Sequence, residues 1–438
     1  MNTNRIIFWI AVYLALVLAP LGLLLAGPVP AGRGFALDAA LALGYLALAV
    51  MGVQFLLTAR FRRATAPFGI DIIYYFHRLI ALVGLALLVG HVLLVYRAKP
   101  GLGALLLSGA MPWHLAAACA SLGLFALLIG LSLWRKQLHT HYEPWRRLHG
   151  ALAVAAVLLA VAHVEGSGYY LHEPWKRAAW TGGALGWVLL IGYIRLLKPA
   201  LMLRRPYRVT AVQAERANTW TLTLQPEGHA GLRFLPGQFT WLTLGHSPFA
   251  ANEHPFSIAS SAEHPERLDL TIKDLGDFTH TIRQVKPGAA AYLDGPYGAF
   301  TIDFHPAASG FVFIAGGVGI APVMSMLRTL ADRGDTRPLT LLYGNMHWEN
   351  VIFREELEAL RARLPLDVVH VLQEGHEGWD GETGFLTQDV LARHLPLAAE
   401  GREYFVCGPK PMIALVERGL HGLGVPQRHV RSELFDLV

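Results

Sequence analysis

The sequence predicts a multidomain membrane protein: a six-helix transmembrane bundle, then an antiparallel β-barrel, then an α/β domain built on a parallel sheet. Leu, Ala, Val and Gly dominate the chain up to about residue 200. Alternating patterns typical of short strands follow, and strands that alternate with helices come last. We therefore expect three domains, over residues 1–200, 206–304 and 308–438.

Six apolar stretches are long enough to cross a bilayer, which takes about 20 residues of helix. They cover residues 7–27, 36–58, 72–95, 113–134, 148–165 and 178–197. The first stretch is too long for the apolar region of a signal peptide, and no clear small-x-small cleavage site follows it. We therefore expect all six to form membrane-spanning helices.

The distribution of Lys and Arg predicts the orientation of these spans. Most basic residues lie in the N-terminus, in the loops after the second and fourth spans, and in the segment after the sixth span. They are Arg5, Arg60, Arg62, Arg63, Arg135, Lys136, Arg146, Arg147, Arg195, Lys198, Arg204, Arg205 and Arg208. The opposite side carries only Arg33, Arg97, Lys99, Lys176 and Arg177. Both termini and the two later domains are thus expected in the cytoplasm, below an inner or plasma membrane. These loops also account for the net charge of +5, so the charge requires no nucleic-acid partner.

Two pairs of histidines share one spacing inside the apolar stretches. His77 and His91 lie fourteen residues apart in the third stretch, and so do His149 and His163 in the fifth. Fourteen residues of helix rise about 21 Å and end within roughly 40° of four whole turns. Because the third and fifth spans run in the same direction, His77 would face His149 and His91 would face His163. The iron of a b-type haem accepts two axial histidines in this way, so the pattern indicates two haems.

Two plainer interpretations of these histidines remain. A single membrane histidine often packs or bridges helices, although two pairs at matched spacing are hard to obtain from packing alone. A path for metal ions would usually place carboxylates beside the imidazoles, and residues 78–90 and 150–162 contain none. The two cysteines, Cys119 in a span and Cys407 near the end, cannot form a disulfide framework.

The pattern of residues 206–304 is that of short strands. Residues 219–224, 239–244 and 267–272 alternate between apolar and polar side chains, and turns rich in Gly and Pro separate such runs. Many short strands at this interval suggest a small antiparallel barrel.

The pattern changes after residue 308. An apolar strand over 310–315 leads into a glycine-rich turn over 316–322 and a helix that continues through Leu330. Further strands are expected over 339–343, 367–372 and 404–406, and a helix over 350–364. This order predicts a parallel nucleotide-binding sheet. The glycine turn lets the backbone approach a phosphate, and the helix N-terminus favours its negative charge, although such a turn alone is a weak signal.

Several motifs occur in a recognisable order. Pro236-Gly237-Gln238-Phe239 looks like the strand before a flavin site, and His254-Pro255-Phe256-Ser257 looks like a flavin signature in its membrane-oxidase form. Gly295-Pro296-Tyr297-Gly298, the loop over 316–322 and Cys407-Gly408-Pro409 follow. This order resembles the ferredoxin–NADP reductase family. With the six spans and four histidines ahead of it, the chain resembles the NADPH oxidase/ferric reductase family over nearly all of its 438 residues.

The resemblance implies FAD and NADPH or NADH as cofactors beside the two b-type haems. It places His254, Pro255, Phe256, Ser257, Gly276 and Thr279 near the flavin, and Gly316, Gly317, Gly319, Pro322, Cys407, Gly408 and Pro409 near the nicotinamide nucleotide. Cys407 and Phe435 would act in catalysis, with Phe435 stacked on the flavin until nicotinamide displaces it. Both have a plainer interpretation, Cys407 as a buried small residue and Phe435 as core.

The chain departs from the family at one position that bears on nucleotide choice. Tyr343-Gly344-Asn345 resembles the family, and NADPH users often follow it with an arginine that pairs with the 2′-phosphate. Met346 and His347 stand here instead, and the nearest acidic residue is Glu349. The sequence leaves the preference between NADPH and NADH open.

Together these parts predict a transmembrane oxidoreductase. A nicotinamide gives two electrons as hydride, a haem takes one at a time, and a flavin can do both. Electrons would pass from cytoplasmic NAD(P)H through FAD and two haems to a small extracytoplasmic acceptor, either oxygen, which gives superoxide, or a ferric chelate. Two alternatives remain: a relay to a periplasmic protein partner and a histidine-lined metal permease, against which the flavin motifs speak.

Overall fold

The computed structural model describes residues 3–28, 30–61, 70–107, 111–250, 252–395 and 401–434. Three residues used above, Arg62, Arg63 and Phe435, lie outside these ranges. The chain divides into two compact units, one made of residues 2–64 and 72–199 and one made mainly of residues 200–438. The boundaries predicted at 206–304 and 308–438, inside the second unit, stay predictions.

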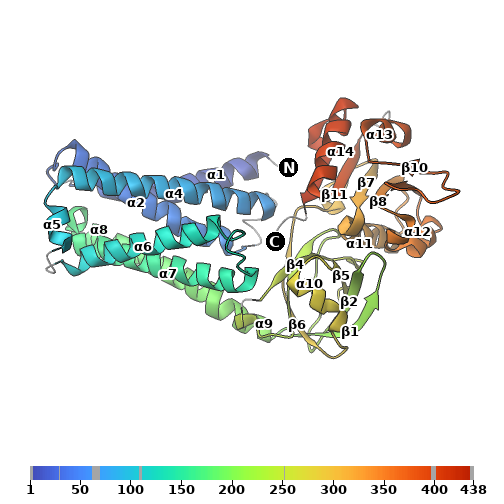
Figure 1. The fold of residues 1–438 in the computed structure, drawn as a ribbon, viewed down its shortest axis with the longest axis horizontal. Coiled ribbons are helices and arrows are strands. Elements are labelled where there is room, and N and C mark those ends of the chain that lie inside the picture. Colours follow the sequence, from blue (N-terminus) through green and yellow to red (C-terminus); the bar gives the residue numbers. More distant parts are fainter. Residues whose placement is uncertain are drawn as a thin grey trace. The chain divides into compact units, whose positions relative to one another are not determined.

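In the described part of the first unit there are six long apolar helices, as the sequence predicts (Figure 1). They are α1 (Thr3–Leu25), α2 (Phe35–Thr58), α4 (Ile70–Ala98), α6 (Trp113–Leu133), α7 (Tyr142–Ser167) and α8 (Pro174–Gly192). A short helix, α5 (Leu102–Leu107), follows α4. The last span continues from α8 through a π-helical turn (Tyr193–Leu197) into α9 (Lys198–Leu203). Each long helix is long and apolar enough to cross a membrane.

The packing of this unit is that of a membrane bundle. Phe125 and Ile129 of α6 pack against Ala156 and Val157 of α7, and the Ser121 hydroxyl donates a hydrogen bond to the Ala156 carbonyl oxygen at 2.8 Å. Small residues at a helix interface let the backbones approach closely, which is the usual way that membrane helices associate. Large apolar side chains such as Leu93, which is 63% exposed, cover the outside and fit contact with lipid rather than water.

The second unit begins with an antiparallel sheet that curls into a barrel. Its strands are β1 (Tyr207–Ala214), β2 (Thr219–Pro226), β3 (Phe239–Leu244), β4 (His254–Ser257), β5 (Leu268–Lys273) and β6 (Ala290–Tyr297). Their order is β4-β3-β6-β1-β2-β5. A bridge between Ile258 and Leu270 brings the two edges together, and side chains such as Leu222 and Leu242 fill the interior. A short helix, α10 (Asp277–Thr281), follows β5.

The C-terminal part of this unit is a parallel sheet with helices on both faces (Figure 1). Its strands are β7 (Gly310–Gly316), β8 (Leu339–Asn345), β9 (Leu366–Leu372), β10 (Glu382–Thr383), β11 (Arg402–Gly408) and β12 (Val430–Leu434), in the order β10-β9-β8-β7-β11-β12. Helices α11 (Ile320–Asp332) and α12 (Arg354–Arg361) contribute to one core, and α13 (Gln388–His394) and α14 (Lys410–Gly422) to the other. The fold class predicted from the sequence is therefore confirmed.

Candidate functional site

The structure brings His77 of α4 and His149 of α7 close together, with their ring planes inclined at 64°. Their ring centroids lie 6.3 Å apart. Metal–imidazole bonds are about 2.0–2.1 Å long in zinc sites, and two such bonds plus half of each ring come to roughly 6 Å. The two rings are therefore spaced as two axial ligands of one metal would be. Among the described residues, no group of three or more His, Cys, Asp and Glu lies together in a way that could hold a metal ion.

Each of the four histidines is held through the same ring atom. His77 Nδ1 lies 2.8 Å from Gln54 Oε1, and His149 Nδ1 lies 3.1 Å from Ser132 Oγ. His91 Nδ1 lies 2.7 Å from the Ala40 carbonyl oxygen, and His163 Nδ1 lies 3.0 Å from the His114 carbonyl oxygen. A carbonyl oxygen can only accept, and the Ser132 hydroxyl already donates to the Leu128 carbonyl oxygen at 2.7 Å. All four rings thus carry their proton on Nδ1.

This tautomer has a direct consequence for ligation. With Nδ1 protonated and bonded, the lone pair of each ring is on Nε2, the atom that a metal would take. Metal-bound histidines nearly always donate their other ring N–H to such an acceptor, which fixes the ring and raises its basicity. The hydrogen bonds on Nδ1 therefore prepare all four histidines for metal ligation, and the ring spacing of His77 and His149 also fits a metal group between them.

The anchors come from two helices in a regular way. Helix α2 holds both histidines of α4, and helix α6 holds both histidines of α7. Ala40 and Gln54 are themselves fourteen residues apart in α2, which matches the spacing of His77 and His91. The sequence analysis missed Gln54 and Ser132, although a polar residue in an apolar span is itself a sign of function.

A glycine in α2 makes room for one ring. A Cβ on Gly44 would lie 2.8 Å from His91 Nδ1. Real Cβ atoms do not approach a neighbour so closely, so any side chain at this position would displace the His91 ring.

Strand β4, which carries His254 and Phe256, contacts Phe278 of α10, next to the predicted Gly276 and Thr279. The His254 ring stacks on Phe278 with centroids 3.9 Å apart, which brings β4 beside the segment 276–279. Phe256 stacks on the same ring at 6.0 Å. Pro255 pairs with Trp241 across β3 and β4. The Thr279 hydroxyl receives hydrogen bonds from the backbone N–H of Leu275 and Gly276, at 2.8 and 2.9 Å, and so shapes this turn.

Ser257 provides a test of whether a flavin fits here. Its hydroxyl is buried and has no hydrogen-bond partner within the described ranges. A buried polar group without a partner is rare in a native structure and points to a missing ligand or water. A flavin ring, which carries polar atoms at its edge, would satisfy this hydroxyl.

The nucleotide loop follows β7, the strand at which the order of strands in the parallel sheet reverses. From β7 the chain moves to β8 and β9 on one side, whereas β11 and β12 lie on the other. Ligands of such sheets bind at this switch point, outside the carboxyl ends of the strands. Gly319 packs against the backbone of Cys407 and Gly408, so the two loops that follow β7 and β11 meet here.

The structure explains why glycine occupies these positions of the loop. Gly317 has a φ of 53°, and a Cβ there would meet nothing within 4 Å, which leaves its backbone open to a ligand. The Tyr343 hydroxyl donates to the Gly317 carbonyl oxygen at 3.0 Å and holds the turn. A Cβ on Gly316 would strike Met412 and Pro409. Pro322 is buried in α11, and Pro409 caps the N-terminus of α14.

Cys407 is fully buried beneath this loop. Burial raises the pKa of its thiol well above the usual range, so the group stays protonated at neutral pH. Its strand neighbours are Ala315 of β7 and Glu433 of β12. The catalytic role predicted for Cys407 stays a prediction, as does that of Phe435, which lies outside the described residues.

Comparison with known families agrees with this division. Residues 43–160 match the ferric reductase like transmembrane component, residues 206–301 match an FAD-binding domain, and residues 313–418 match the oxidoreductase NAD-binding domain. These matches define the class: a membrane-embedded oxidoreductase with an FAD-binding and an NAD-binding domain.

The relatives named next align with 41–53% of this chain. Ferredoxin–NADP reductase B of Sorangium cellulosum is 31% identical over 243 residues, which are 53% of this chain and 98% of that protein. NADH-cytochrome b5 reductase 1 of Pyricularia oryzae is 33% identical over 186 residues, 41% of this chain and 60% of that protein. The FAD/NAD-binding domain of nitric oxide dioxygenase from Vibrio cholerae has 24% identity and a TM-score of 0.47, over 53% of this chain and 98% of that one. Three domains of these kinds in this order make up the architecture of the NADPH oxidase/ferric reductase family.

Proposed function

We propose that the protein passes electrons from cytoplasmic NAD(P)H, through FAD and two b-type haems, to a small extracytoplasmic acceptor. The observation that carries this proposal is the set of four histidines, each fixed through Nδ1 and each left with a free Nε2. A set of packing histidines would have no reason to share one tautomer. The FAD-binding and NAD-binding domains supply the matching electron source.

The bound groups would supply the redox chemistry: a flavin takes two electrons as hydride and releases them singly, and a haem carries one at a time. The chain itself holds and orients them. His77 with His149 would hold one haem and His91 with His163 the other. Side chains around Ser257 and His254 would hold the flavin, and the backbone of Gly316–Gly319 would hold the nucleotide's pyrophosphate.

The domains and their orientation form part of the same proposal. The haem domain would span residues 1–200, the flavin domain 206–304 and the nucleotide domain 308–438. The basic loops would face the cytoplasm, together with both termini and the nucleotide domain, in an inner or plasma membrane. His77 and His149 would then form the inner pair, closer to the flavin side.

The acceptor is proposed from the same geometry. Both histidines of each pair would be engaged in holding a haem, which would supply single electrons to an acceptor that is not itself coordinated there. That favours an acceptor which needs no metal coordination here, such as oxygen or a ferric chelate. A relay to a periplasmic protein would instead give poor turnover with soluble acceptors.

The test uses the purified, detergent-solubilised full chain with added FAD and each nucleotide in air. Superoxide is trapped and NAD(P)H oxidation is followed at the same time. Two superoxide per NAD(P)H would establish an oxidase, whereas haem reduction without superoxide and fast turnover with a ferric chelate would establish a metal reductase. A protein that binds no haem would overturn the proposal.

A further inference from the structure

Helix α11 follows the nucleotide loop in the chain, and its side chains contact the segment that follows the flavin motif. It begins directly after Gly319, and one of its faces packs into the core of the nucleotide domain. Another face carries Ser325, Arg328 and Thr329, and Arg333 follows at the C-cap, where the helical repeat continues the same stripe. Each of these four side chains makes a hydrogen bond to residues of the barrel domain or its final turn.

Three of these contacts reach the stretch just after β4. The Ser325 hydroxyl donates to the Ser260 carbonyl oxygen at 2.8 Å, and Arg328 Nη1 donates to the Ala259 carbonyl oxygen at 2.7 Å. The backbone N–H of Ala262 donates to Thr329 Oγ1 at 2.9 Å. Ser325 and Thr329 are fully buried, so water cannot replace these bonds.

The Arg328 guanidinium is fixed on its other side too. It forms two hydrogen bonds with Glu356 of α12, both at 2.7 Å, and its side chain is 17% exposed. A bidentate carboxylate contact holds the planar group in one orientation. Arg328 therefore cannot follow a shifted Ala259 without breaking its bonds to Glu356.

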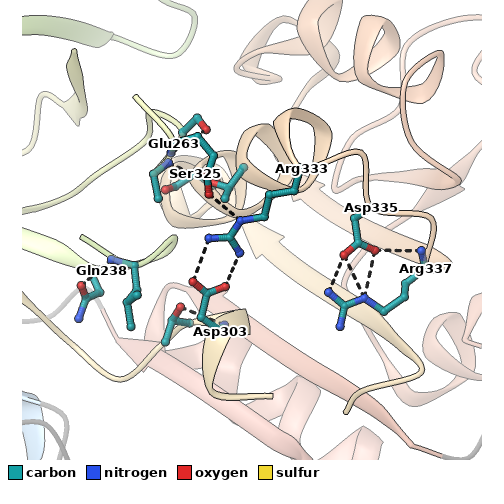
Figure 2. A network of polar contacts seen from close by, with 12 residues as sticks. Gln238, Glu263, Asp303, Ser325, Arg333, Asp335 and Arg337 are labelled. Carbon is teal, nitrogen blue, oxygen red and sulfur yellow. Dashed lines mark hydrogen bonds and ion pairs between the residues drawn. The ribbon is translucent and has the colours of Figure 1, made fainter. Parts of the chain in front are cut away.

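Arg333 extends the contact to the end of α11. Figure 2 shows its guanidinium between Glu263 and Asp303, with Nε 2.6 Å from Glu263 Oε1 and Nη1 2.6 Å from Asp303 Oδ1. The same figure shows Arg337 paired with Asp335. Its Nη2 lies 2.6 Å from Asp335 Oδ2 and its Nη1 donates to the Ala308 carbonyl oxygen at 3.5 Å, so both partners lie within residues 308–438. The chain thus offers one arginine that crosses between domains and a neighbour that does not.

These hydrogen bonds lie next to both predicted cofactor sites, so they affect the distance between the sites as well as stability. Only Ile258 separates the flavin motif, which ends at Ser257, from Ala259, and the nucleotide loop ends where α11 begins. Helix α11 is therefore bonded to the segment that follows the flavin motif and is also continuous with the nucleotide loop. A displacement of about 1 Å between reacting groups can cost about a hundredfold in rate, so such a fixed register matters for transfer.

We propose that α11 sets the distance between the nicotinamide and the flavin, with Ser325, Arg328 and Thr329 as positioning residues. This inference rests on the proposed function. In the step that these residues serve, one C–H bond of the dihydronicotinamide breaks, its hydrogen and both electrons pass to oxidised flavin, and one proton comes from water. The buried bonds hold the two domains in register before the nucleotide binds.

The experiment is anaerobic stopped-flow reduction of the flavin in the full-length, FAD-loaded protein, with protiated and 4-deuterated nucleotide. Thr329→Val and Arg328→Met should lower the limiting rate of flavin reduction by about tenfold to a hundredfold, the range expected for sub-ångström to 1 Å misplacement. The nucleotide's dissociation constant should stay within about twofold. In a parallel steady-state assay with the same two nucleotides, the deuterium isotope effect should rise, because hydride transfer limits turnover more strongly. Thr329→Ser, which keeps the hydroxyl, should restore the rate.

Controls separate this role from a structural one. Arg337→Gln, which breaks a pair inside the nucleotide domain, should leave the rate and the isotope effect unchanged. Ser325→Ala removes one hydrogen bond with little change in side-chain volume. It replaces Thr329→Val or Arg328→Met as the test variant if either of these loses its FAD. Ser325→Ala and Thr329→Val that keep the wild-type rate and isotope effect would overturn the inference. Wild-type flavin that neither nucleotide reduces would instead overturn the proposed function.

Discussion

The two histidine pairs of the membrane unit are anchored by different parts of the chain. His77 and His149 bond to side chains, those of Gln54 and Ser132. His91 and His163 bond to main-chain carbonyl oxygens, those of Ala40 and His114. Substitution of Gln54 or Ser132 can therefore delete an acceptor of the first pair, whereas substitution of Ala40 or His114 keeps the main-chain acceptor of the second.

This difference suggests a division of labour between two similar sites. The hydrogen bond on Nδ1 tunes the basicity of a ligand histidine, and with it the potential of the metal. At the first pair the acceptor of this bond is a side chain that substitution can change, and at the second pair it is a main-chain carbonyl oxygen. Substitutions that affect one site alone are the way to test this.

The largest effect is expected from the histidines themselves. His77→Ala should remove the haem of the first pair and lower the haem content from two per chain to one. His91→Ala should remove the other haem. Haem content and the optical spectrum of the purified variants measure both. Equal loss of both haems from either variant would mean that the sites are not independent.

The next effect is expected from Gly44→Ala, which should disturb the second pair only. The new Cβ would lie 2.8 Å from His91 Nδ1, so the ring must move and lose its bond to Ala40. We expect partial loss or altered spectra of one haem, seen by low-temperature optical or EPR spectroscopy. Gly123→Ala is the matched control, because nothing lies within 4 Å of a Cβ there. Identical spectra for both variants would contradict the structure at α2.

Gln54→Leu should change the first site without removing it. The substitution deletes the acceptor of the His77 N–H and the donor that reaches the His77 carbonyl oxygen at 3.3 Å. Loss of such a partner typically weakens metal binding about 10–100-fold, and a less basic ligand raises the reduction potential. A redox titration should show one haem shifted to a more positive potential. Ala40→Ser, which keeps the main-chain acceptor of His91, should shift neither haem.

The smallest effect is expected from Ser132→Ala. Its hydroxyl lies 3.1 Å from His149 Nδ1, a longer contact than the 2.8 Å between His77 and Gln54. We expect a shift in the same direction as for Gln54→Leu but smaller, well under the roughly 59 mV that corresponds to a tenfold change for one electron. A larger shift for Ser132→Ala than for Gln54→Leu would reverse the ranking of the two bonds.

Much of the architecture could be predicted because it depends on local patterns. Apolar length identifies the six spans, and a fourteen-residue interval identifies the histidine pairs. The anchors could not be predicted, because they depend on which helices lie side by side. Gln54 matters only once α2 lies beside α4, and Ala40 contributes a carbonyl that every residue has.

Element ends were harder to predict than element types. The fifth span begins at Tyr142 rather than 148, because its polar first turns are helical although they are not apolar. The helix predicted over 350–364 is Arg354–Arg361, since Phe353 takes a φ of 59° just before it. In the second unit the α11 contacts join distant segments, so no local pattern could have indicated them.

The central claim is that the four histidines hold two haems that NAD(P)H reduces through FAD. The most direct measurement is the haem content and anaerobic optical spectrum of the purified full chain, before and after addition of FAD with NADH or NADPH. We predict two b-type, low-spin haems per chain, both reduced only when FAD and a nucleotide are present together. A chain that binds no haem, or haems that stay oxidised under these conditions, would contradict the account.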